Sequence, residues 1–451
     1  MHKMIGFRPI ILLCVVLVLL GASASLAQAE RVQIELMLGG WQFEFMTNHI
    51  EPAFEERFPE YDLVLRPFDN YGQIWENYLL AREQGENPAL VQGTETLTQT
   101  LRDSGKFKPL WEALGGRSAI NGIDLALDDF VPAIYAYYAI DGQLYSMPWN
   151  TSAPLLFANM DLLVEAGIAT DLADLDALPG TWQELEAACE TILAQTDAHC
   201  AYWRVNPWWF ENPMAQAGEY MINMENGRAG RADEVLLASE AGIELMTWWI
   251  SMLERGHFVN YGANPGDAPL TDFATGNLAF SAASSSAGTR TLNNALSENG
   301  YTLGTGFLPH NGEREYFSIG IGGGTIYLSD GLAPEVEEAA LTFMAFNVLP
   351  ENDAAYHLSF GYIPVRNSTA AVLSEGDWPP VFQTASRQFA AGRATNGVGP
   401  LLPTFLETRD VLSSAMEAII FDGADIEAAL TEASADASAI LQEYNLLVAG
   451  E

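Results

Sequence analysis

The sequence predicts an α/β fold in two domains, and three observations support this. The chain has 451 residues, which exceeds an average domain and suffices for two substantial cores. Hydrophobic residues make up 49% of the chain, which excludes a disordered protein. After its N-terminal segment, the chain opens with a strand, a helix and a second strand. This order is typical of a sheet with crossover helices.

The N-terminal segment has the three parts of a secretory signal peptide. Lys3 and Arg8 precede and flank an apolar run at 9–20, and an Ala-Gln-Ala sequence at 27–29 is a small-residue cleavage pattern. We therefore expect residues 1–29 to be removed before Glu30. Cys14 lies inside the apolar run, so it does not form a lipid-attachment motif. No later run approaches the ~20 apolar residues of a membrane span. The mature chain is expected to be exported, soluble and periplasmic or otherwise extracytoplasmic.

The charge balance excludes two classes of partner. Lys and Arg total 20 against 59 Asp and Glu, a net charge of −39, and only Lys106 and Lys108 remain as lysines after cleavage. Nucleic acids and anionic membranes demand basic patches, so neither is an expected partner. An anionic ligand would have to be held by strong local donors.

Cysteine and histidine usage makes a metal site or a resident cofactor unexpected. Only Cys189 and Cys200 remain after cleavage, close in sequence and in an oxidising compartment. A structural disulfide and two free thiols are both open at this stage.

Periodicity predicts the remaining elements. Strands are expected at 32–38, 62–66, 89–92, 304–309 and, interrupted by glycines, 317–328. Helices are expected at 41–58, 72–84, 181–195, 232–251, 269–275, 336–346, 409–420 and 426–447, with another starting at 97–101 and a capped loop at 107–114.

The stretch Gly276 to Arg290 is the most informative one. An apolar strand at 278–282 runs into Ser284, Ser285 and Ser286, and a helix follows at 287–296. Serines between a strand and a helix supply N-cap side chains beside unpaired backbone N–H groups, and such a helix start attracts anions. An ordinary capped helix is the alternative.

The order of motifs along the chain resembles a known family. These motifs are the segment 144–157, the Pro179 to Glu184 helix entry, the Gly276 to Ser285 strand, the glycines 322–324 and the Gly361 to Pro364 segment. Together they resemble the extracellular solute-binding proteins of ATP-driven (ABC) importers, and within that family the members that bind sn-glycerol 3-phosphate. The resemblance covers nearly the whole mature chain.

The resemblance implies a two-lobed periplasmic-binding-protein-like fold of type II, with a ligand cleft between lobes joined by crossing strands. Lobe 1 would comprise 30–147 plus 323–365, and lobe 2 would comprise 151–318 plus 366–451. It also implies a non-enzymatic, monomeric protein that delivers a small-molecule ligand to an ABC permease in the membrane. The ligand would be sn-glycerol 3-phosphate or a glycerophosphodiester, with a sugar or oligosaccharide as the alternative.

Seven positions match the family's binding residues. Hydroxyls of Tyr71, Ser152, Ser284 and Tyr362 would bond ligand oxygens, and the Gly323 amide would approach an oxyanion closely. Glu95 would accept hydrogen bonds from glycerol hydroxyls, and Arg409 would face the phosphate with its guanidinium fork. Five of the seven have a structural alternative of their own: core packing for Tyr71, a solvated surface for Glu95, a turn for Ser152, a β-bulge for Gly323, and an ion pair with Asp410 or Glu407 for Arg409. For Ser284 the alternative is the ordinary capped helix.

An aromatic cluster lies beside these motifs. Trp203, Trp208 or Trp209 would line the cleft, and a cleft aromatic could hold a choline headgroup or stack on a sugar. Core packing is the third alternative. A secreted hydrolase is disfavoured, because the chain has no Gly-x-Ser-x-Gly, His-Glu-x-x-His or Ser-x-x-Lys motif.

Overall fold

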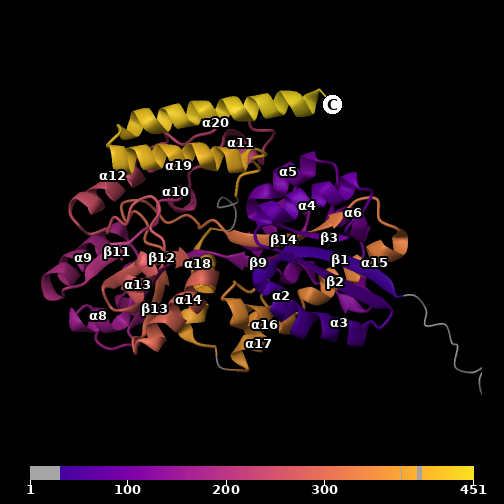
Figure 1. Cartoon of the computed structure of the whole chain (residues 1–451), viewed down its shortest axis with the longest axis horizontal. Helices are drawn as coiled ribbons and strands as arrows, with labels where there is room; N and C mark the ends of the chain where they lie inside the picture. The colour runs from indigo at the N-terminus through magenta and orange to yellow at the C-terminus, as the bar shows by residue number, and fades with distance from the viewer. Residues whose placement is uncertain (1–30, 377, 394–398, 451) are drawn as a thin grey trace, which may run out of the picture.

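The computed structural model describes residues 31–376, 378–393 and 399–450, so the expected signal peptide lies outside the described residues. The chain forms two halves, each built around one sheet (Figure 1). In the first sheet the order is β2 (Tyr61–Phe68), β1 (Val32–Gly39), β3 (Leu90–Thr94), β14 (Gly322–Ser329) and β4 (Phe107–Lys108), and β9 (Met147–Ser152) also pairs with β14. In the second sheet the order is β11 (His199–Tyr202), β12 (Leu278–Ser284), β10 (Pro154–Asn159) and β13 (Leu303–Phe307).

Helices cover both faces of the first sheet, which is why its central strands are apolar on both sides. β1 is parallel to β2 and β3, whereas β14 is antiparallel to β3, β4 and β9. The helical elements of this half are η1 (Gly40–Gln42), α2 (Phe43–Phe45), η2 (Met46–Ile50), α3 (Glu51–Arg57), α4 (Tyr71–Glu83), η3 (Glu95–Leu97), α5 (Thr98–Asp103), α6 (Leu110–Leu114), η4 (Leu127–Asp129), α7 (Pro132–Tyr138), α15 (Pro334–Asn347), α16 (Pro350–Phe360) and α17 (Thr369–Ser374). Two short hairpins complete it, β5 (Ala119–Ile120) with β6 (Ile123–Asp124) and β7 (Ala139–Ile140) with β8 (Gln143–Leu144).

The second half ends in a long helical hairpin. α19 (Phe405–Asp422) packs on α20 (Ile426–Ala449), and α20 also contacts α12 (Glu240–Glu254) (Figure 1). The other helical elements are α8 (Met160–Glu165), η5 (Leu175–Ala177), α9 (Trp182–Gln195), α10 (Trp208–Gln216), α11 (Asn223–Gly227), α13 (Ala268–Ala274), α14 (Ser285–Glu298) and α18 (Pro380–Ala391). Among the described residues, none of the helices combines the length and the apolar character that crossing a bilayer demands.

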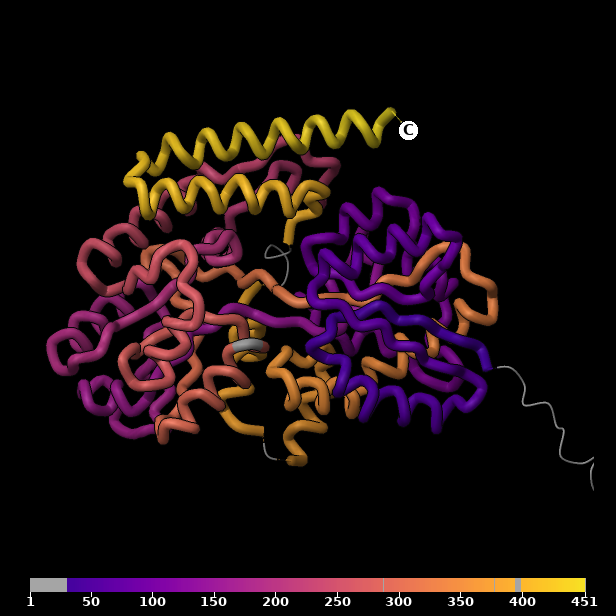
Figure 2. Tube along the Cα trace, in the orientation of Figure 1, coloured from indigo at the N-terminus to yellow at the C-terminus, as the bar shows by residue number. Residues whose placement is uncertain are grey.

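Two connections between the halves are made by extended chain (Figure 2). β9 belongs to the first sheet and β10 to the second, and Ala153 is the only residue between them. The chain returns through residues 308–321 into β14, which lies beside β9. Both connections therefore pass side by side through the boundary between the halves.

One segment lies in a different half from the one that the sequence suggested. Residues 366–374 were expected in lobe 2, yet they pack on the first half: Arg366 donates to the carbonyls of Leu125 and Val348, and α17 packs on α16. Arg366 is buried and can be charged there because carbonyl oxygens surround its guanidinium. No local sequence signal reports those distant carbonyls.

Other expected elements differ in extent. Residues 232–239 were expected to begin a long helix, but α12 starts only at Glu240, with Ser239 accepting from the Gly242 N–H. The expected loop at 107–114 contains the short strand β4 and helix α6. Cys189 and Cys200 form a disulfide between α9 and β11, which settles the alternative that the sequence left open.

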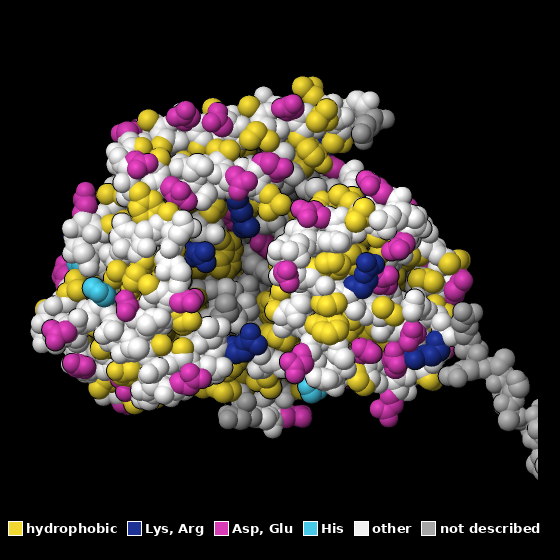
Figure 3. Space-filling view, viewed as in Figure 1, with side chains coloured by type: hydrophobic (Ala, Val, Ile, Leu, Met, Phe, Trp, Pro, Cys, Tyr) yellow, Lys and Arg dark blue, Asp and Glu magenta, His cyan; other side chains and the backbone are white. Residues whose placement is uncertain are grey.

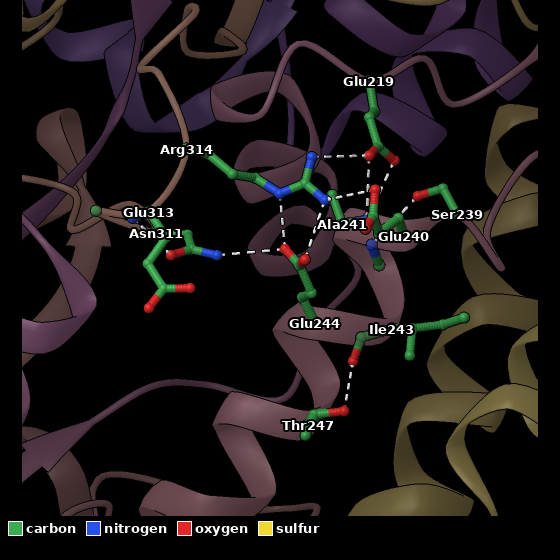
Figure 4. A network of polar contacts seen from close by, with 12 residues as sticks. Glu219, Ser239, Glu240, Ala241, Ile243, Glu244, Thr247, Asn311, Glu313 and Arg314 are labelled. Carbon is green, nitrogen blue, oxygen red and sulfur yellow. Dashed lines mark hydrogen bonds and ion pairs between the residues drawn. The ribbon is translucent and has the colours of Figure 1, made fainter.

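The one cation of the 308–316 segment is fully engaged inside the second half (Figure 4). The Arg314 guanidinium donates to both carboxylate oxygens of Glu244, at 2.7 and 3.1 Å, and also pairs with Glu219 and Glu240. This network fixes the start of α12 against the chain that leads into β14. It leaves Arg314 no capacity to bind a ligand.

Asp353 links the folding free energy to pH. This buried carboxylate accepts from the Val365 and Arg366 N–H groups and from the Thr369 hydroxyl. Burial raises its pKa to about 7, against the lowering effect of those hydrogen bonds. An unfolded Asp titrates near about 4. The folded state therefore binds more protons between these values, and Asp353 makes stability fall as pH rises from about 4 to about 7.

We expect the unfolding free energy of the wild type, minus that of Asp353→Asn, to decrease by roughly 3 to 4 kcal/mol across this window. Urea denaturation at several pH values measures it. Taking the difference cancels the pH-dependent contributions of other groups to stability. One of these is buried His357, whose pKa is lowered to about 4 and whose contribution has the opposite sign. A difference that stays constant or grows with pH would contradict this role for Asp353.

Candidate functional site

The candidate site lies where the connecting strands pass between the halves, beside a hollow visible in Figure 3. Ser152, the last residue of β9, pairs with Gly322, and Thr151 pairs with Gly323. The Ile363 N–H donates to the Thr151 carbonyl at 2.6 Å, which brings Tyr362 to the same place. Ser152 is thus a buried strand residue rather than a turn serine.

Gly323 is required by the backbone geometry. Its φ is +99°, and an added Cβ would lie 1.8 Å from the Asn150 carbonyl oxygen. The register between β14 and β9 shifts between Gly323 and Thr325, so the β-bulge considered from the sequence is present. The bulge accounts for the glycine whether or not its amide contacts a ligand.

A cluster of hydroxyl and amide groups surrounds Asn150. Its Nδ2 donates to the Tyr71 hydroxyl at 3.0 Å, and its Oδ1 accepts from Gln92 at 2.9 Å, which fixes the orientation of the amide. Tyr71 also packs edge-on against Trp41, with 5.1 Å between ring centres. Tyr71 therefore has both roles considered from the sequence: its ring packs, and its hydroxyl joins a polar network.

Tyr362 joins this cluster to the serines. Burial raises the pKa of Tyr362, and hydrogen bonding with Asn150, Trp41 and Ser286 opposes the rise. Burial likewise raises the pKa of Tyr71 well above its usual value. Both phenols are consequently neutral at physiological pH and can donate to a ligand oxygen.

The serines divide into two roles. The Ser285 hydroxyl accepts from the Ala153 N–H, and its own N–H donates to the Ala153 carbonyl, so it binds the connecting strand. Ser284 has extended backbone at the start of α14 but makes no side-chain cap, contrary to the expectation from the sequence. Its hydroxyl lies 3.1 Å from that of Ser286, because the pairing of Ser284 with Pro154 holds it on the strand.

A charged group occupies the other end of the site. Arg409 on α19 donates through two nitrogens to the two carboxylate oxygens of Glu211 on α10, at 2.7 and 2.6 Å. Glu95 of η3 lies 3.7 Å from the same guanidinium. The Phe405 ring packs against it, with 4.7 Å from Cζ to the ring centre. The proposed local pairing with Asp410 or Glu407 is therefore wrong, because the partners come from other elements.

Glu95 is 8% exposed, which excludes the solvated surface position considered for it. Burial raises its pKa to about 7, while Arg409 lowers it and Glu211 raises it. Glu95 also acts electrostatically on Tyr71, so the two ends of the site are close enough to interact. With two carboxylates and one guanidinium, this end carries no free positive charge.

Only one of the three candidate tryptophans lies at the site. Trp203 and Trp209 are 3% and 5% exposed, and Trp203 packs among Trp209, Trp248, Trp249 and Phe258 in the core of the second half. Trp208 is half-buried and lies beside Gly322 together with Ser152. A Cβ added to Gly322 would be 3.0 Å from the Trp208 ring and 3.0 Å from the Ser152 hydroxyl. Trp208 also lines a small cavity with Glu211 and Phe405.

Sequence reasoning missed several residues of this site. Asn150 lies in the 144–157 segment, and Arg290 ends the Gly276 to Arg290 stretch, so both were within reach of a motif argument. Glu211 followed the tryptophan-rich segment without a distinguishing pattern. Trp41 lies in η1, which follows β1 directly, and no spacing in the sequence relates it to Tyr71.

Comparison with known proteins identifies the family. The family described as bacterial extracellular solute-binding protein matches residues 52–386. The chain belongs to this family. It is therefore the extracytoplasmic, non-enzymatic solute-binding component of an ABC importer, as the motifs predicted.

Curated relatives of this solute-binding protein include "sn-glycerol-3-phosphate-binding periplasmic protein UgpB". That from Yersinia pseudotuberculosis is 27% identical over 71% of each chain, and that from Salmonella typhimurium is 28% identical over 76% of each chain. Among solved structures, UgpB from Mycobacterium tuberculosis in complex with glycerophosphocholine has a TM-score of 0.71 at 20% identity, covering 91% of this chain and 99% of that one.

A sugar-binding protein is similar to the same degree. The MalE structure from Xanthomonas citri has a TM-score of 0.76 at 17% identity, covering 93% of this chain and all of the other. Both structural likenesses confirm the predicted two-lobed α/β fold. They do not distinguish one ligand class from the other.

Proposed function

We propose that this solute-binding protein delivers sn-glycerol 3-phosphate or a glycerophosphodiester to its permease. One observation supports the proposal most: the two ends of the site differ in charge. Hydroxyls of Ser284, Ser286 and Tyr362 gather at one end, where no carboxylate of the described residues bonds to them. A buried carboxylate, Glu95, stands at the other end.

This asymmetry suits a ligand with an anionic group and free hydroxyls. Neutral hydroxyls donate to phosphate oxygens without repelling them, whereas a carboxylate accepts from glycerol hydroxyls and repels phosphate. The ligand would thus bind in one direction. Relatives named as sn-glycerol-3-phosphate-binding proteins, at 27–28% identity, support the same class.

Trp208 offers a ring to the additional group of a glycerophosphodiester. A quaternary ammonium such as that of choline is attracted by an aromatic face and by carboxylates, and Trp208 lines its cavity with Glu211 and Phe405.

A sugar or oligosaccharide is the second candidate. It is favoured by Trp41 and Trp208, two ring systems beside the polar cluster that could stack on a sugar face, and by the engagement of Arg409 with Glu211.

Isothermal titration of the full mature chain with sn-glycerol 3-phosphate, glycerophosphocholine and maltose tests the proposal. We expect heat and a change in tryptophan fluorescence with at least one phosphate-bearing ligand and none with maltose. Binding of maltose alone would replace the proposed ligand class with the sugar class. A bound ligand would also raise the melting temperature, since it binds only the folded chain.

A further inference from the structure

One arginine at the site forms no ion pair with a carboxylate of the described residues. Arg290 is exposed on α14, and its guanidinium packs on the ring of Phe360, 5.7 Å from Cζ to the ring centre. By contrast, the arginines of the described residues that form ion pairs with carboxylates are Arg31, Arg66, Arg117, Arg231, Arg255, Arg314, Arg366, Arg393 and Arg409. Among the described residues, Arg57, Arg82, Arg102, Arg204, Arg228 and Arg387 likewise form no ion pair with a carboxylate. What sets Arg290 apart is therefore its place beside Ser286 and Tyr362.

Arg290 lies at the hydroxyl end of the site. It is four residues after Ser286 on the same helix, so both side chains lie on one face. Its charge acts on the Tyr362 hydroxyl, which bonds with Ser286. The Ser286 hydroxyl in turn lies 3.1 Å from that of Ser284. Three hydroxyls and one cation thus come together from α14, the end of β12 and the segment after α16.

Arg409 is not available in the same way. The two nitrogens that would form a fork for phosphate are both bonded to Glu211, whose side chain is 11% exposed. A phosphate that took this fork would leave Glu211 buried without a partner, which is strongly unfavourable. The sequence placed the ligand's counter-charge on Arg409, whereas the structure holds a free counter-charge elsewhere.

We propose that Arg290, together with Ser284, Ser286 and Tyr362, binds the anionic group of the ligand, while the pair of Arg409 with Glu211 stays intact. This inference rests on the proposed function, because it presupposes an anionic ligand. It assigns the phosphate to the hydroxyl end and leaves Glu95 to the rest of the ligand.

Titration calorimetry of Arg290→Gln with sn-glycerol 3-phosphate tests the inference. We expect affinity to fall roughly 10- to 100-fold and to depend less on salt than in the wild type, because one charged contact is lost. Arg290→Lys keeps the charge and is expected to retain most of the affinity. Melting temperatures of all variants, which should match the wild type, report whether folding has changed.

Arg57→Gln is the matched control. Arg57 is also exposed and its guanidinium also packs on an aromatic ring, that of Phe58 at 5.4 Å, but it lies on α3 away from the serines. If Arg290→Gln binds sn-glycerol 3-phosphate as tightly as Arg57→Gln does, the inference is overturned. Loss of affinity in Arg290→Lys equal to that in Arg290→Gln would overturn it as well. If the wild type binds neither sn-glycerol 3-phosphate nor glycerophosphocholine, the proposed function itself fails.

Discussion

Replacing Gly323 by Ala is expected to abolish ligand binding and to lower the unfolding free energy by about 3 kcal/mol or more. An Ala Cβ would lie 1.8 Å from the Asn150 carbonyl oxygen, and φ at this position is +99°, where an L side chain is strained. The clash is with backbone, so no side chain can rotate away. Relief requires β9 and β14 to separate, and these are the strands that lead between the two halves.

Urea denaturation and titration calorimetry measure the two effects. Gly230→Ala is the control, because a Cβ there meets only the Met224 sulfur at 3.9 Å and φ is not positive. If Gly323→Ala unfolds at the same urea concentration as Gly230→Ala, the close approach of the two strands does not constrain this position.

Replacing Arg409 by Ala is expected to destabilise the folded chain by about 3 to 5 kcal/mol even without ligand. Glu211 and Glu95, which are 11% and 8% exposed as side chains, would then face each other with no cation between them. Arg409 now lowers the pKa of Glu95, so its removal raises that pKa above about 7. A carboxyl with a raised pKa loses stability as pH rises, so the defect is greatest at neutral pH and smaller near pH 4.

Urea denaturation at neutral pH and near pH 4 measures the loss of stability in Arg409→Ala. A double variant that carries both Arg409→Gln and Glu211→Gln completes the test. The double variant removes one positive and one negative charge together, and we expect it to be more stable than Arg409→Ala. Equal stability of Arg409→Ala and the wild type at neutral pH would show that the pair contributes nothing. The same reasoning means that lost ligand affinity in Arg409→Ala alone does not identify a phosphate contact.

Local patterns predicted most of the elements. Apolar alternation gave β1 at nearly its observed bounds, and the Thr181 to Glu184 helix entry forms a capping box at the start of α9. These features depend on neighbours in the sequence, so a window of residues contains their cause. Predictions differed from the structure where contacts with distant residues determine the conformation or position of a segment. Residues 232–239 are not helical. Residues 366–374 pack on the first half through the carbonyls that surround Arg366.

The candidate site shows the same division. The sequence proposed Tyr71, Ser152, Ser284, Gly323 and Tyr362 as candidates, and the structure brings these residues to the boundary between the halves, because β9, β12, β14 and the segment at 361–365 meet there. The sequence could not show that Trp203 is enclosed by other aromatics, since a tryptophan has the same local pattern in a core and in a cleft.

The sequence by itself determined the acidic character of the chain, the order of strands and helices, and the family, and it predicts an export signal. Only the tertiary structure decided which charges are free. Arg409 and Arg290 have the same side chain, yet Arg409 is held by Glu211 from a helix 198 residues away, whereas Arg290 forms no ion pair with a carboxylate of the described residues and packs on the Phe360 ring. Coulomb energies depend on distance in space, and folding sets that distance independently of separation along the chain.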